Sequence, residues 1–124
     1  MLRQELKTQQ FLDKIYSDEV PFVVLRELFK IWKEQGYKSF EVNFVSFDNL
    51  AARLGWQIND ETLNKLEESL KYLYGIFVVE KGSGFSPICS LLGDKSAGMF
   101  SGLLKVAQYV NDGNIDAVKA IKKI

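Results

Sequence analysis

The sequence predicts a single α+β domain that is mostly helical. Apolar residues recur at helical spacing in several segments, which is typical of amphipathic helices packed on a common core. Two shorter segments, residues 40–44 and 76–79, are rich in β-branched and aromatic residues and favour strands. The chain has 124 residues, of which 47% are hydrophobic and 26% are charged. This length and composition fit one globular domain spanning residues 1–124.

Residues 1–17 carry apolar side chains at loosely helical spacing, from Leu2 to Tyr16. The polar run Ser17-Asp18-Glu19 then interrupts the pattern, and Val20-Pro21 begins a new one. We expect the segment to form a helix packed on the rest of the domain. An arm used for dimerisation is the alternative interpretation.

The clearest amphipathic segment follows, and it predicts a helix over residues 22–35. Its apolar side chains stand at positions i, i+1, i+4, i+5 and i+8, namely Val24, Leu25, Leu28, Phe29 and Trp32. Pro21 suits the first turn of this helix, because backbone N–H groups in a first turn have no partner within the helix and proline therefore loses no hydrogen bond there. Gly36 suits the position just after the helix end.

A short strand and two further helices are predicted next. Residues 40–44 alternate between apolar and polar, as a half-buried strand does. Ser46 is placed to cap a helix over 47–54 that Gly55 closes. Asn59 or Asp60 caps the following helix, which Gly75 ends. The buried stripe of that helix is predicted to consist of four leucines, Leu63, Leu66, Leu70 and Leu73.

A hairpin and two closing helices complete the predicted order. Residues 76–79 form its first strand, 81–84 its turn and 85–92 a return strand that Pro87 interrupts. A helix is then predicted over 95–110, and a short one from Ile115 to the end. Gly98 and Gly102 lie four residues apart on the first of these helices, beside Phe100. We expect this spacing to mark a close helix crossing, either within the chain or across a homodimer interface.

Composition excludes several kinds of chemistry. The chain has no histidine and one cysteine, so catalytic triads with a histidine base and zinc sites of the usual kinds are impossible. We expect no catalytic residues, no metal and no cofactor, and therefore a protein that is not an enzyme. The polar N-terminal segment and the lack of a long apolar run predict a soluble, cytoplasmic protein without a membrane partner.

The order of helix, strand, helix, helix and hairpin resembles the winged helix-turn-helix superfamily. Residues 45–56 carry the closest resemblance, because a capping serine precedes a Leu-Ala pair and a Leu-Gly ending. The resemblance implies a winged-helix core of three helices and a β-hairpin over about residues 21–92. Extra helices are expected at the N-terminus and, over residues 94–124, at the C-terminus.

The resemblance also implies where DNA would bind. In that superfamily the third helix enters the major groove. In this sequence the third helix of the implied core is the one that ends at Gly75. The implied contacts come from that helix, the wing and the preceding helix: Asn64, Lys65, Lys71, Tyr72, Lys81 and Arg53. Supporting charge would come from Lys33, Lys38 and the terminal Lys119, Lys122 and Lys123. Glu61 and Glu68 stand on the same outward face and oppose contact with phosphates.

Three functions remain open at this point. The first is a homodimeric regulator of transcription or replication accessory that binds double-stranded DNA. The second is a winged helix that binds a protein partner, which the net charge of zero favours. The third is a small-molecule-binding domain, since residues 86–89 followed by 98–102 are similar to part of the vinyl-reductase-type ligand-sensing domains.

Overall fold

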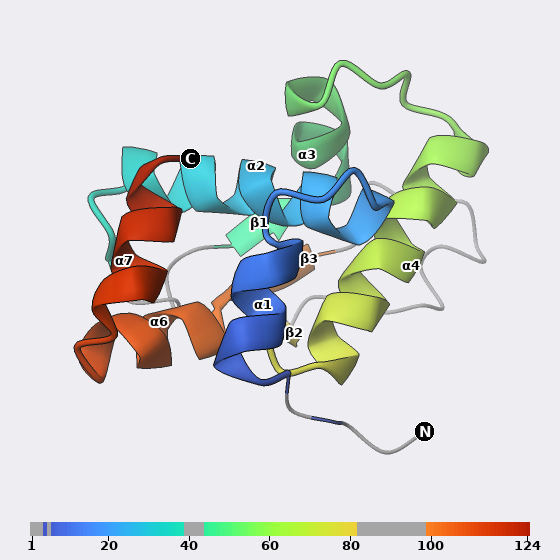
Figure 1. The fold of residues 1–124 in the computed structure, drawn as a ribbon. Helices are drawn as coiled ribbons and strands as arrows, with labels where there is room; N and C mark the ends of the chain where they lie inside the picture. Colours follow the sequence, from blue (N-terminus) through green and yellow to red (C-terminus); the bar gives the residue numbers. More distant parts are fainter. Residues whose placement is uncertain (1–3, 5, 39–43, 82–98) are drawn as a thin grey trace.

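A computed structural model describes residues 4, 6–38, 44–81 and 99–124 of the chain (Figure 1). This part of the chain is α+β and mostly helical, as predicted. Its elements in chain order are α1 (Thr8–Lys14), α2 (Val20–Glu34), β1 (Phe44–Ser46), α3 (Phe47–Arg53), α4 (Asp60–Gly75), β2 (Val79–Lys81), β3 (Met99–Leu103), α6 (Leu104–Asn111) and α7 (Ile115–Lys122).

The α2 helix forms the centre of the core. The predicted apolar stripe is buried along its whole length, from Val24, which is fully buried, to Trp32, which is 6% exposed, and Phe22 before it is buried as well. This stripe packs against α3, α4 and β3. Pro21 lies in the first turn, and Gly36 follows the helix end with a φ of +74°. The prediction of a helix over 22–35 is therefore confirmed, with the start at Val20.

Both predicted caps of the next two helices are present. The Ser46 hydroxyl accepts a hydrogen bond from the Asn49 N–H at 3.2 Å, and this caps α3. The Asn59 side chain accepts from the Thr62 N–H at 3.0 Å, while the Asn59 N–H donates to the Thr62 hydroxyl, which forms a reciprocal capping box for α4. The four leucines of α4 are buried, with the most exposed of them, Leu63, at 6%.

Gly75 ends α4, as predicted. Gly75 is the last helical residue, and Phe77 takes the left-handed conformation with a φ of +63°. The Val78 N–H donates to the Leu73 carbonyl and the Phe77 N–H donates to the Tyr74 carbonyl, which is the Schellman pattern of helix endings. Because this turn occupies residues 76–77, the strand begins at Val79 and not at Ile76 as predicted.

The three strands form one antiparallel sheet in the order β1-β3-β2. Val45 pairs with Phe100, and Glu80 pairs with Ser101, so the central strand is β3. The β1 strand begins at Phe44, and the rest of the strand predicted over 40–44 lies outside the described residues. The predicted return strand over 85–92 also lies outside them, and within the described part β2 pairs with β3.

The helix predicted over 95–110 is wrong at residues 99–103, which form β3; the helix α6 begins at Leu104. Apolar residues at positions 100, 103, 104 and 107 fit a helix by spacing alone. The backbone of 99–103 is instead hydrogen-bonded to a strand on each side, which is a tertiary effect that local spacing does not contain. The expected Gly-x-x-x-Gly helix crossing is therefore wrong, because Gly102 lies in a strand; Gly98 lies outside the described residues.

Helices α1, α6 and α7 close the structure on one side of α2 (Figure 1). The ring of Phe11 contacts Phe29 of α2 and Tyr109 of α6, at centroid distances of 6.4 and 5.5 Å. The Tyr16 hydroxyl donates to the Ala120 carbonyl of α7 at 2.6 Å. The N-terminal segment is thus a helix packed on the domain. No helix in the described ranges is long and apolar enough to cross a membrane.

Gly55 and Gly75 form a matched pair for testing how the helices end. Gly55 has a φ of +73°, Gly75 is helical, and a Cβ would meet nothing within 4 Å at either position. We expect Gly55→Ala to lower the free energy of unfolding by about 1 kcal/mol, because an L-residue is strained in the left-handed region. Gly75→Ala should leave it unchanged or raise it by up to about 1 kcal/mol.

Urea denaturation of the two variants measures this difference. Equal effects of the two substitutions would contradict the assigned conformations.

Candidate functional site

The outward face of α4 brings four of the predicted DNA contacts together. Asn64, Lys65, Lys71 and Tyr72 all lie on this helix and are exposed. Their surroundings are acidic, because the same helix carries four carboxylates, Asp60, Glu61, Glu67 and Glu68.

The charged and aromatic groups of this face already have partners within the fold. Lys71 pairs with Glu67 at 3.2 Å, one turn away. The Lys65 ammonium lies 5.2 Å from the centre of the Trp56 ring, in a cation–π contact. The Tyr72 ring packs edge-on against the buried Phe22 at 6.2 Å. A phosphate backbone approaching α4 would therefore meet the exposed carboxylates of Glu61 and Glu68 and two lysines that are already engaged.

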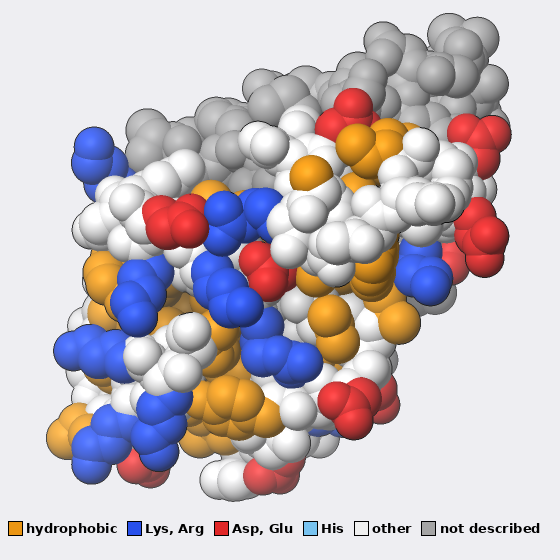
Figure 2. Space-filling model, turned by 90° about the horizontal axis from the view of Figure 1, so that it is seen from above, with side chains coloured by type: hydrophobic (Ala, Val, Ile, Leu, Met, Phe, Trp, Pro, Cys, Tyr) orange, Lys and Arg blue, Asp and Glu red, His pale blue; other side chains and the backbone are white. Residues whose placement is uncertain are grey.

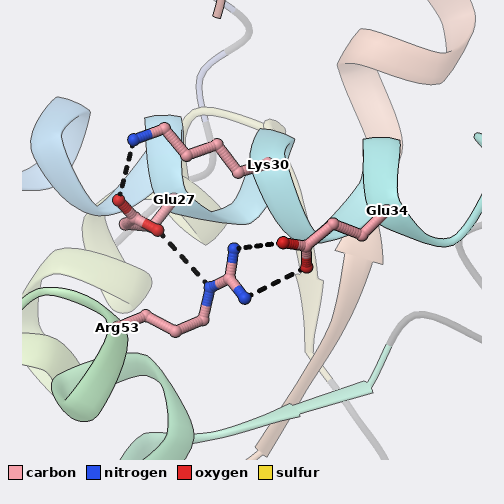
Figure 3. A network of polar contacts seen from close by, with 4 residues as sticks. All are labelled: Glu27, Lys30, Glu34 and Arg53. Atoms are coloured by element: carbon pink, nitrogen blue, oxygen red, sulfur yellow. Dashed lines mark hydrogen bonds and ion pairs between the residues drawn. The ribbon is translucent and has the colours of Figure 1, made fainter.

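Arg53, at the end of α3, joins α3 to α2 (Figure 3). Its two terminal nitrogens donate to the two carboxylate oxygens of Glu34 at 3.0 and 3.1 Å, in a bidentate pair. Its Nε lies 3.4 Å from Glu27, which also pairs with Lys30 at 3.1 Å. The hydrogen bond to Glu34 raises the pKa of the guanidinium against the lowering effect of burial. Arg53 thus links α3 to α2 through ion pairs with Glu27 and Glu34, and we call this linkage the Arg53 clasp.

The remaining predicted site residues lie in the sheet or outside the described residues. Lys81 ends β2 and Phe100 lies within β3, but their side chains lie outside the described part of the structure. Gly102 is in β3 as well. The homodimer interface assigned to Gly98, Phe100 and Gly102 stays a prediction, without the helix crossing on which it was based.

A basic surface lies elsewhere, on α2 and α7. Figure 2 shows Lys and Arg side chains gathered on one side of the face seen from above. The exposed lysines that these two helices contribute are Lys30, Lys33, Lys119, Lys122 and Lys123, the last at the C-terminal cap of α7. We call this set the α2–α7 surface.

The α2–α7 surface joins residues far apart in the sequence because the C-terminal ends of the two helices meet. Trp32 of α2 and Ile121 and Lys122 of α7 line one common groove. The carboxylates of α2 that border the surface, Glu27 and Glu34, are both bound to Arg53, and Glu27 also pairs with Lys30, which leaves four lysines of the surface without a carboxylate of α2. The surface therefore keeps an excess of positive charge, although the whole chain has a net charge of zero.

Sequence reasoning named Lys33, Lys119, Lys122 and Lys123 only as supporting charge for α4. Their spacing within each helix was visible as i, i+3 and i+4 repeats on polar faces. The contact between the two helix ends was not, because it depends on how α6 and α7 fold back. Within the described ranges, no cluster of three or more potential metal-ligating side chains is present.

No known protein family, curated protein or solved structure shows a significant match to this chain.

Replacing Arg53 tests its role as a clasp. We expect Arg53→Met to lower the free energy of unfolding by about 1 kcal/mol, because a bidentate ion pair within a network contributes more stability than an isolated surface pair. Lys71→Met is the matched control: it removes a single ion pair within one helix and should cost less than about 0.5 kcal/mol.

A double-mutant cycle with Glu34→Gln assigns the effect to the pair. A coupling energy near zero between Arg53 and Glu34 would contradict the clasp.

Proposed function

We propose that this chain is a winged-helix domain that binds the phosphate backbone of nucleic acid along the α2–α7 surface. The order α2-β1-α3-α4-β2-β3 supports the winged-helix assignment, as does the sheet order β1-β3-β2. The pairing of β2 with β3 supports a wing, and α1, α6 and α7 are then the additions to the core. A regulator of transcription or an accessory of replication are the roles that fit this proposal.

The observation that carries the proposal is the concentration of exposed lysines on two adjoining helix ends. Protein–DNA affinity comes largely from lysines and arginines that displace counterions from phosphates. The lysines of α2 and α7 stand on the exposed faces of two helices, and α4, the helix that reads bases in winged helices, does not contribute to this set. This arrangement fits backbone contact with little dependence on base sequence.

The acidic α4 supports placing the contact away from the third helix. In winged helices that read bases, the exposed face of that helix must lie against two phosphate strands. Here Glu61 and Glu68 are exposed on it, and Lys65 and Lys71 are engaged by Trp56 and Glu67. We therefore propose the α2–α7 surface in place of the α4 contacts.

Two charge-reversal variants of equal size test the proposal. Binding is measured by fluorescence anisotropy on a labelled duplex of about 20 base pairs. Lys119→Glu with Lys122→Glu should weaken binding at least about ten-fold at low salt, because phosphate contacts are lost and repulsion is added. Lys65→Glu with Lys71→Glu makes the same change in net charge on α4 and should alter affinity less than about two-fold.

The salt dependence supplies an independent check. With about four phosphates contacted, log K should fall with log salt at a slope of roughly −4. Undetectable binding at low salt would contradict the proposal, and so would a larger loss in the α4 variant than in the α7 variant.

A protein-interaction module is the second candidate, and the acidic α4 specifically favours it. Ile58, which precedes α4, is 54% exposed, and Tyr72 on α4 is 40% exposed. Exposed apolar side chains beside carboxylates fit a basic protein partner. If the chain binds no duplex, Glu61→Lys with Glu68→Lys should abolish binding of such a partner, as measured by isothermal titration calorimetry.

A further inference from the structure

A groove of about 500 Å³ lies where the end of α2 meets α6 and α7. Its apolar wall includes Trp32, Val110, Val118 and Ile121, from three different helices. Its volume is within the range of about 300–1,000 Å³ that small-molecule sites occupy. The groove is large enough for a ligand of moderate size and opens to solvent.

One wall of the groove is held in place before any ligand arrives. The Trp32 indole N–H donates to the Lys38 carbonyl at 2.8 Å, and the Tyr37 ring stands edge-on to the Trp32 ring at 5.0 Å. Tyr37 has a φ of +58°, an uncommon conformation for a residue other than glycine. The Tyr37 N–H bonds to the Trp32 carbonyl as part of the turn that ends α2. Such strained, well-supported positions collect at binding sites.

Apolar surface is left open to water in this groove. Tyr37 is 42% exposed and Val110 is 37% exposed, and both line it. Covering these side chains removes apolar area from water, which favours binding of an apolar group.

The polar residues of the groove indicate the charge of the ligand. Lys38 and Lys122 line it together with Asn111, and among the described residues no carboxylate lines it. The exposed Lys119 and Lys123 lie on α7 with Lys122, so the lysines of this helix outnumber its one carboxylate, Asp116. A few polar groups placed around an apolar wall are what fixes the orientation of a small ligand.

We propose that this groove binds a small organic carboxylate with an apolar body. The ligand carboxylate pairs with the ammonium groups of Lys38 and Lys122, and the Asn111 side-chain amide donates a hydrogen bond to it. The apolar body of the ligand packs against Trp32 and Tyr37. The site does not depend on nucleic-acid binding. Because Lys122 belongs to both surfaces, the bound carboxylate would compete with phosphate where both bind.

Calorimetric titration with 2-naphthoate and dodecanoate, and with their uncharged alcohols, tests the site in the full chain. Saturable binding of at least one acid is expected, and the matching alcohol should bind at least about ten-fold more weakly, because charge-assisted hydrogen bonds are lost. In a Trp56→Phe background, where Trp32 is the single tryptophan, binding should change the fluorescence of Trp32.

Two lysines on one helix supply the matched variants. Lys122→Gln should weaken binding of the acid at least about ten-fold, whereas Lys123→Gln, which is not a lining residue, should change it less than about two-fold. Val118→Phe fills the groove without changing charge and should abolish binding. If Val118→Phe fails to melt cooperatively, Ala107→Leu serves the same purpose from α6.

The site is overturned if neither acid binds below about 1 mM, which corresponds to about −4 kcal/mol. It is also overturned if the two lysine variants behave alike, or if a folded, groove-filling variant still binds. Duplex binding by Val118→Phe should be unchanged, so failure of the groove and failure of the nucleic-acid surface are distinguishable.

Discussion

The apolar face of α2 contacts three neighbouring elements, and the rest of the structure depends on its burial. Phe22, Leu25 and Phe29 are each 2% exposed or less, and each such side chain contributes about 1.5–3 kcal/mol relative to its exposed state. The helix packs on α3, α4 and β3, and Phe11 of α1 closes over Phe29. Because only one stripe of α2 is buried, the charged side chains on its other faces are free to pair with neighbouring groups or to face solvent.

Those outer faces separate the charge of the chain. Glu27 and Glu34 pair with Arg53 and link α2 to α3, Lys30 also pairs with Glu27, and both Lys30 and Lys33 stay exposed. The acidic side chains of α4 are thereby placed away from most of the exposed lysines of α2 and α7. A chain with sixteen residues of each charge still presents one basic surface and one acidic helix. This separation is what directs the proposed nucleic-acid contact to α2 and α7, and it also explains the positive surroundings of the groove.

Much of the fold could be predicted from the sequence because its helices carry local signals. Ser46, Asn59 and Gly55 act as predicted, and the leucine stripe of α4 is buried. The β3 strand could not be predicted, since residues 99–103 are held by two partner strands distant in the sequence. The left-handed conformation of Phe77 could not be predicted either, because phenylalanine rarely adopts a positive φ. The candidate surfaces depend on the contact between the ends of α2 and α7, nearly ninety residues apart, for which single-sequence spacing has no signal.

The central claim is that phosphate contacts lie on α2 and α7 and not on α4. Titration of the isotopically labelled protein with a short duplex, followed by amide chemical shifts in NMR, tests it directly. We expect the largest shifts on Lys30, Lys33 and residues 119–123, and we expect them to diminish as salt is added. Shifts concentrated on residues 61–72 of α4, with α7 unchanged, would contradict it.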